Sequence, residues 1–135
     1  MAEVVIVCGS KSDLTFVEPT EKVLREENIS CKVQVLSAHR NPKETAEFAR
    51  KAASAGVKVI IAAAGLSAAL PGVIASHTDL PVIGLPVPTG PLNGIDALLS
   101  ILQMPGGVPV ATVGLGSQGP KNAALLAVRI LKLKK

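Results

Sequence analysis

The sequence is nearly free of aromatic side chains. Its 135 residues include no tryptophan and no tyrosine, and Phe16 and Phe48 are the two phenylalanines. Proteins that bind single-stranded nucleic acid usually stack the bases on aromatic side chains, so this composition argues against a nucleic-acid partner. The net charge of +4 is a modest basic excess, which we interpret as solvated surface.

Cysteine and histidine are scarce as well. Cys8 and Cys31 lie in apolar runs with no CxxC pair, so we expect reduced, buried thiols with a structural role. His39 and His77 are the two histidines, and without a cysteine cluster they are too few to predict a zinc site. His77 follows an expected helix, where a positive group is stabilising without any catalytic role.

No export signal or membrane span is visible in the sequence. The first apolar run covers residues 4–8 and ends at Gly9, and no basic stretch precedes a long apolar one at the N-terminus. We therefore expect no membrane partner and a cytoplasmic location.

What the sequence does contain is a regular alternation of short β-branched runs and longer helix-like segments. The apolar runs are residues 4–8, 31–36, 57–61, 82–85 and 108–113. The helix-like segments are residues 14–28, 42–55, 68–76, 93–102 and 122–133. This alternation predicts an α/β fold in one domain over residues 1–135: a three-layer αβα sandwich with a mostly parallel sheet of about five strands, flavodoxin-like or Rossmann-like. Pro19 predicts a kink or a restart in the first helical segment.

The loops that follow the apolar runs are the candidate sites, because ligands bind beyond the carboxyl ends of the strands in such sheets. The first of them is Gly9-Ser10-Lys11-Ser12-Asp13. A glycine turn with two hydroxyls at the start of a helix favours a phosphate or a ribose, since backbone N–H groups are unpaired there. Capping of the helix by Ser12 or Asp13 is the alternative explanation.

The second loop, Ser37-Ala38-His39-Arg40-Asn41-Pro42, combines an imidazole with a guanidinium. His39 can exchange a proton near neutral pH, and Arg40 can grip a phosphate with two parallel hydrogen bonds. Asn41 is expected to cap the next helix, with Pro42 at its first position. A surface pair without function is the alternative, but the position beside the first loop favours a site.

Two further loops are less specific. Residues 62–72 are mostly small, which fits either close contact with a flat ligand ring or tight packing between helices. Residues 86–94 are rich in proline and glycine, with Thr89 and Asn93 as polar positions, and fit either a pocket wall or a subunit contact.

Several blocks of the sequence together resemble the N5-carboxyaminoimidazole ribonucleotide mutase family of purine biosynthesis, also called the catalytic subunit of phosphoribosylaminoimidazole carboxylase. The blocks are Gly-Ser-Lys-Ser-Asp at 9–13, Ser-Ala-His-Arg-Asn-Pro at 37–42, Leu-Pro-Gly at 70–72, Leu-Pro-Val-Ile-Gly-Leu-Pro-Val at 80–87, Gln-Met-Pro-Gly-Gly-Val-Pro-Val at 103–110 and Asn-Ala-Ala-Leu-Leu-Ala at 122–127. They extend over nearly the whole chain, and their common order argues against a chance match.

The resemblance implies an isomerase with His39 as the general acid and base. The implied reaction moves a carboxylate from an exocyclic nitrogen to a ring carbon by decarboxylation and recarboxylation, and it requires no metal, nucleotide or biotin. Six residues are implied to bind the substrate or to line its site: Ser10, Ser12, Asp13, Ser37, Arg40 and Gly65. The implied partners are a small ribonucleotide substrate and further copies of the chain in a homo-octamer.

One position departs from the mutase pattern. Mutases of the bacterial type usually carry a histidine just before Leu-Pro-Gly, and here that position is Ala69. The animal-type branch, which carboxylates aminoimidazole ribonucleotide directly with carbon dioxide, also lacks this histidine but tends to have lysine in place of Arg40. A mutase is therefore the leading interpretation, with a direct carboxylase and a non-catalytic ribonucleotide-binding relative as alternatives.

Overall fold

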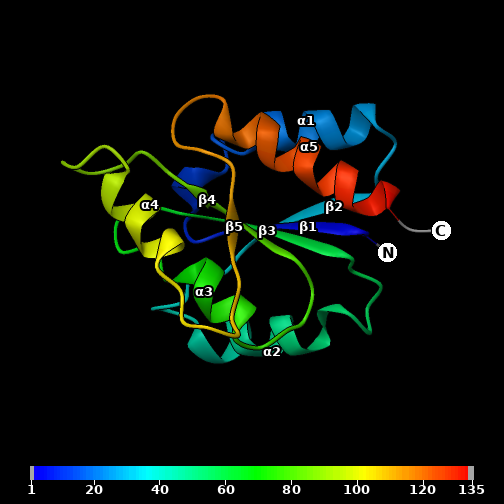
Figure 1. Ribbon diagram of the computed structural model, residues 1–135, viewed down its shortest axis with the longest axis horizontal. Helices are drawn as coiled ribbons and strands as arrows, with labels where there is room; N and C mark the ends of the chain where they lie inside the picture. Colours follow the sequence, from blue (N-terminus) through cyan, green and yellow to red (C-terminus); the bar gives the residue numbers. More distant parts are fainter. Residues whose placement is uncertain (1, 134–135) are drawn as a thin grey trace.

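The computed structural model describes residues 2–133, which form one sheet with helices on both faces (Figure 1). The strands are β1 (Val4–Cys8), β2 (Cys31–Val35), β3 (Val59–Ala64), β4 (Val82–Pro86) and β5 (Ala111–Thr112). All pairs are parallel, and the order is β2-β1-β3-β4-β5, as in flavodoxin-like folds. The predicted fold class is confirmed. Residues 1, 134 and 135 of the predicted domain lie outside the described residues.

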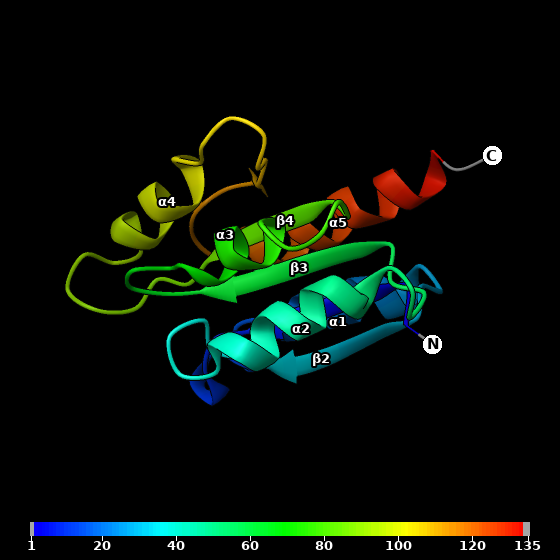
Figure 2. The same ribbon diagram turned by 90° about the horizontal axis from the view of Figure 1, so that it is seen from below.

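The helices cover the two faces of the sheet unequally. They are the 3-10 turn η1 (Lys11–Asp13), α1 (Glu18–Glu26), α2 (Pro42–Ala52), α3 (Leu70–Ala75), α4 (Ile95–Leu102) and α5 (Gly119–Lys132). Helices α1 and α5 lie side by side on one face, whereas α2 and α3 cover the other (Figures 1 and 2). Helix α4 packs on the same face as α2 and α3, and its residues Ala97 and Ile101 are buried in the core there. Within residues 2–133, no helix has the length and apolarity needed to span a membrane.

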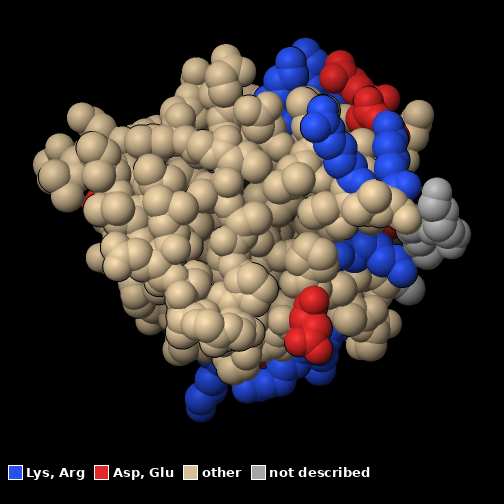
Figure 3. Space-filling model, viewed as in Figure 1, with Lys and Arg blue, Asp and Glu red and all other residues tan. Residues whose placement is uncertain are grey.

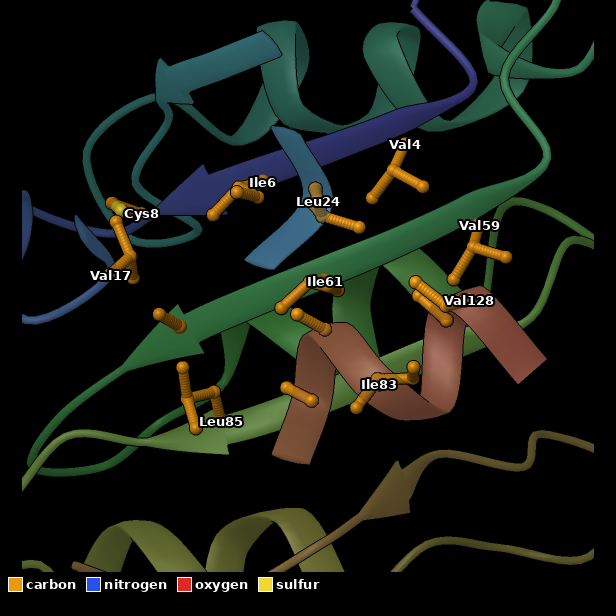
Figure 4. Packing of buried hydrophobic residues seen from close by; sticks show 14 of the residues in the cluster. Val4, Ile6, Cys8, Val17, Leu24, Val59, Ile61, Ile83, Leu85 and Val128 are labelled. Atoms are coloured by element: carbon orange, nitrogen blue, oxygen red, sulfur yellow. The ribbon is translucent and has the colours of Figure 1, made fainter. Parts of the chain in front are cut away.

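Each face of the sheet has its own apolar core. On the first face, Ile6 and Ile61 of the strands lie with Leu24 of α1 and Val128 of α5 (Figure 4). The other core contains alternate residues of the same strands together with residues of α2, α3 and α4. Every residue of β1, β3 and β4 is buried, which explains why these strands read as continuous apolar runs.

Several predicted boundaries differ from the structure by a few residues, and a proline is involved in three of these differences. The strand predicted over residues 108–113 shrinks to β5, because Pro109 has no N–H to donate to a neighbouring strand. The helix predicted over residues 14–28 begins only at Glu18, which places Pro19 in its first turn and confirms the expected restart. The last helix begins at Gly119 instead of residue 122, with Pro120 in the first turn.

The strand order opens a crevice at the carboxyl edge of the sheet. The chain adds β2 on one side of β1 and then adds β3 on the other side. Helix α1 follows β1 on one face of the sheet, and α3 follows β3 on the opposite face (Figure 1). The two loops that leave β1 and β3 therefore diverge, and a ligand can enter between them.

Candidate active site

A cleft of about 470 Å³ lies at the carboxyl ends of β1, β2 and β3. The loops after these three strands form its walls, and Thr89 contributes from the loop after β4. All seven predicted site residues line this cleft: Ser10, Ser12, Asp13, Ser37, His39, Arg40 and Gly65. The fold thus brings together positions that are far apart in the sequence, and the roles assigned to them stay predictions.

The first loop carries a pair of hydroxyls beside a buried carboxyl. The Oγ of Ser10 lies 2.9 Å from the Oγ of Ser12 and accepts a hydrogen bond from the N–H of Ser12 at 3.3 Å. Ser10 therefore caps the η1 turn, in place of Ser12 or Asp13, the two caps that the sequence suggests. One hydroxyl proton is used between the two serines, and the other is free to reach a ligand.

Asp13 is the most enclosed ionisable group of the cleft, with 6% of its surface exposed. Burial raises the pKa of its carboxyl above the ordinary 3.8, and a hydrogen bond with the backbone of Ser10 acts in the opposite direction. A buried carboxylate is costly unless it has partners, so this position is suited to a ligand that donates hydrogen bonds. Ribose hydroxyls are such donors.

The second loop is held in shape by Ser37 and Asn41. The Oγ of Ser37 accepts from the N–H of Arg40 at 3.1 Å, and its carbonyl accepts from the N–H of Asn41 at 2.8 Å. The Oδ1 of Asn41 accepts from the N–H of Ser37 at 3.3 Å. Asn41 occupies the N-cap position of α2 and Pro42 its first position, as predicted, but the Asn41 side chain closes this turn and makes no capping hydrogen bond.

His39 and Arg40 are presented at the cleft wall by this turn. Both are exposed, and within residues 2–133 neither side chain has a hydrogen-bond or ion-pair partner. A free guanidinium can bind a phosphate, and a free imidazole can move a proton on a bound ligand. Together with Asp13, they supply one acidic, one basic and one proton-exchanging group to a single cavity.

Gly65 lies where the loops after β3 and β4 meet. A side-chain carbon at this position would overlap the Cγ2 of Thr89, and it would lie 3.3 Å from the carbonyl oxygen of Val87. Glycine therefore allows the two loops to close on each other at the edge of the cleft. Thr89 had been noted as a possible pocket wall, and it lines the cleft, whereas Asn93 does not.

The loop after β3 supplies lining residues to which the sequence assigned no role, and two of them are exposed. Leu66 and Ser67 belong to the small-residue loop after β3, and both are exposed at the cleft. Residues 62–72 contain two leucines, Leu66 and Leu70, and the sequence does not distinguish the exposed one from the buried one. Ala69 lines the same cleft and also a neighbouring cavity of about 340 Å³, which His39 shares.

The two cysteines and the second histidine do not line the cleft. Burial raises the pKa of the Cys8 thiol to about 12, with smaller effects from the charges of Asp13 and Glu21, so the thiol stays protonated. Cys8 is buried and free as predicted, whereas Cys31 is free but only partly buried. His77 lies in the turn after α3, outside the cleft. No group of three or more His, Cys, Asp or Glu residues in the described part could hold a metal ion.

Comparison with other sequences gives matches over the whole described chain. A family model described as AIR carboxylase matches residues 3–135. A protein of Saccharolobus solfataricus named N5-carboxyaminoimidazole ribonucleotide mutase is 51% identical over 99% of this chain and 84% of its own length. Proteins of the same name from Pyrococcus abyssi and Thermotoga maritima are 52% and 50% identical over 99% of this chain, and the matches cover 76% and 77% of them.

Comparison with solved structures agrees with the sequence matches. The PurE structure of Treponema denticola is similar with a TM-score of 0.86 and 33% identity, over 98% of this chain and 81% of that one. A 3-dehydroquinate dehydratase-like protein of Bifidobacterium longum has a TM-score of 0.63 and 14% identity over 98% and 99% of the chains, which shows the fold alone. The family model covers nearly the entire sequence, the relatives are half identical over their shared length, and the chain therefore belongs to the AIR carboxylase family.

Proposed function

We propose that this chain is an N5-carboxyaminoimidazole ribonucleotide mutase of purine biosynthesis, acting as a single domain over residues 1–135. It converts N5-carboxyaminoimidazole ribonucleotide to 4-carboxyaminoimidazole ribonucleotide. The observation that carries this proposal is the shared cleft, in which His39 and Arg40 face the Ser10 to Asp13 loop. Relatives that bear the name of this mutase are about half identical over nearly the whole chain.

The polar side of the cleft suits the ribose phosphate of the substrate. Arg40 binds the phosphate, because its guanidinium is exposed and has no partner among residues 2–133. Ser10, Ser12 and Ser37 supply hydroxyls around the phosphate and ribose, and Asp13 accepts hydrogen bonds from ribose hydroxyls. These assignments leave Gly65 and its neighbours to line the site of the ring.

His39 carries the proton in both halves of the reaction. The bond between the exocyclic nitrogen and the carboxylate carbon breaks, carbon dioxide departs, and the electron pair stays on the nitrogen, which takes a proton from the His39 imidazolium. The ring carbon then attacks the carbon dioxide, a C–C bond forms, and neutral His39 removes the proton from that carbon. The imidazolium is restored, so the cycle consumes no proton and uses no cofactor.

The decisive experiment follows conversion of the N-carboxylated ribonucleotide to its carbon-carboxylated isomer. The wild-type chain is expected to catalyse the isomerisation, and His39→Asn is expected to lose about 10² to 10⁴ in kcat because proton transfer is removed. His77→Asn is the matched control, since His77 lies outside the cleft. Unchanged turnover in His39→Asn contradicts the assigned role, and binding without turnover in the wild type favours a non-catalytic relative.

Ala69 favours direct carboxylation of aminoimidazole ribonucleotide as the second candidate. It lines the cleft beside His39, so His39 is the single imidazole among the described lining residues. The animal-type branch of the family, which carboxylates directly, also lacks a histidine at this position. The two reactions are distinguished by the substrate that is consumed and by whether turnover requires added bicarbonate.

We also propose that the chain assembles into a homo-octamer, and the distribution of charge supports such an assembly. Between residues 59 and 120, the charged side chains are Asp79 and Asp96, and all fourteen lysines and arginines lie outside this range. On the face shown in Figure 3, the charged side chains gather away from α4, over which the surface is almost uncharged. A surface of this kind is suited to contact with other copies.

A further inference from the structure

Leu66 has a backbone conformation that is unusual for its residue type. Its φ of 54° lies in the left-handed region, where a branched side chain is strained. Asn28 and Asn93 share a positive φ, but asparagine adopts this conformation readily. Strained residues persist where the surrounding structure holds them, and they concentrate at sites that bind ligands.

The loops after β3 and β4 interlock around Leu66. A side-chain carbon on Gly90 would lie 2.6 Å from the Cδ2 of Leu66, and one on Gly65 would overlap the Cγ2 of Thr89. Each loop therefore has a glycine at the place where a side chain of the other loop lies. This reciprocal contact fixes the position of Leu66 at the edge of the cleft.

Leu66 also offers the largest free apolar surface in the cleft. It is 52% exposed, whereas Leu70 is 2% exposed and Ala68 is 3% exposed. None of the residues that line the cleft is aromatic. Covering an apolar surface in a cavity with a ligand lowers the free energy of the complex, so a flat ring placed against Leu66 would be stabilised.

We propose that Leu66 is a specificity-determining residue that packs against the imidazole ring of the substrate. The inference rests on the proposed function, because it takes the ligand to be a ribonucleotide whose phosphate lies at Arg40. With the ribose and phosphate on the polar side of the cleft, the ring lies toward Gly65 and Leu66. The interlocked loops hold the leucine in place before the substrate arrives, so little freedom is lost on binding.

The test compares a ligand that has the ring with one that lacks it. Calorimetry measures the binding of aminoimidazole ribonucleotide and of ribose 5-phosphate to the full chain and to Leu66→Ala and Leu66→Gly. Both variants are expected to bind the ribonucleotide about fivefold more weakly, the size expected for losing part of a buried leucine side chain. Their affinity for ribose 5-phosphate stays within twofold of the wild type. Leu133→Ala, in an exposed leucine at the end of α5, is the matched control.

Thermal unfolding of the same variants separates ligand contact from folding. Leu66→Gly relieves the positive φ, whereas Leu66→Ala keeps most of that strain, so their Tm values differ while their ribonucleotide affinities agree. Affinities that follow Tm, or equal losses for both ligands, overturn the role of Leu66. Wild-type binding in which the ring adds no affinity overturns this inference alone. Wild-type protein that binds neither ligand overturns the proposed function and this inference together.

Discussion

At the scale of single residues, Asp13 combines a cost in stability with a predicted role in binding. Its pKa is raised mainly by burial, so the ionised form is disfavoured in the folded chain. We predict that Asp13→Asn raises Tm at neutral pH, because the neutral amide has nearly the same shape and no charge to bury. The same variant is expected to bind the ribonucleotide about tenfold more weakly, since a charge-assisted hydrogen bond to the ribose is lost.

The Tm difference between Asp13→Asn and wild type is expected to depend on pH. A carboxyl whose pKa is raised on folding stabilises the fold in acid and loses that contribution as the pH rises through its folded pKa. The Tm difference between Asp13→Asn and wild type is therefore largest near neutrality and closes in acid. Glu44→Gln, on the exposed surface of α2, is the control. A difference that is constant with pH contradicts the explanation by burial.

Arg40 is predicted to act through the phosphate of the ligand. Arg40→Ala should weaken ribonucleotide binding about 10- to 100-fold, the size of one lost charge-assisted contact. The loss should be much smaller for the dephosphorylated nucleoside, and Arg40→Lys should be intermediate, because lysine keeps the charge without the paired geometry. Equal affinity of the wild type for the nucleoside and the nucleotide contradicts the assignment.

The polar residues of the site were easier to predict than its apolar wall. Ser10, His39 and Arg40 lie in the loops that follow apolar runs, and the carboxyl ends of parallel strands meet at one edge of the sheet. No such pattern indicated Leu66. Its position in the cleft wall depends on its backbone φ and on contact with Gly90, which follows a different strand. Contacts between separate loops depend on how the strands are ordered, and local sequence does not encode that order.

At the scale of elements, the sequence predicted β1 without error and β5, one of the two edge strands, poorly. The run over residues 4–8 is observed as β1 without change, because burial on both faces leaves a continuous apolar stretch. Around β5 the pattern is ambiguous, since the strand pairs on one side only and Ala111 is exposed. The starts of α1 and α5 were misplaced because each helix has a proline in its first turn. A proline alone does not show whether a helix begins or breaks at that point.

Helices α1 and α5 are joined by one buried hydrogen bond. The Oγ1 of Thr20 donates to the carbonyl of Pro120 at 2.7 Å, and Thr20 is fully buried. We predict that Thr20→Val, which keeps the shape but removes the hydroxyl that donates to this carbonyl, lowers the free energy of unfolding by about 0.5 to 1.5 kcal/mol. Chemical denaturation at one fixed protein concentration measures the change.

Thr15→Val is the control for that substitution. Thr15 is exposed in the turn before α1, so its replacement is expected to change stability by less than about 0.5 kcal/mol. Because Thr20 does not line the cleft, Thr20→Val should keep the wild-type turnover at temperatures where it is folded. Equal stability of the two variants would show that the buried hydrogen bond contributes nothing.

At the scale of the whole molecule, α4 has apolar residues on two faces. Ala97 and Ile101 pack on the sheet, whereas Ile95, Leu99 and Leu102 are 54%, 48% and 56% exposed. The three exposed residues are spaced by four and three positions, so they share one side of the helix. A helix with a second apolar side is stable in water when another surface covers it, and the proposed octamer would supply that surface.

We predict that Leu99→Lys disrupts the assembly, because it places a charge in the centre of this apolar side. Analytical ultracentrifugation should give the wild type a mass near eight times the 13.8 kDa of one chain, and the variant a smaller mass. Leu133→Lys, at the exposed end of α5, should keep the wild-type mass. Turnover should fall when assembly is lost. Residues 88–93 connect the Thr89 wall of the cleft to α4 and are all exposed, so contacts between copies at α4 would also hold this wall. A monomeric wild type, or a Leu99→Lys protein of unchanged mass, excludes this side of α4 as the contact between copies.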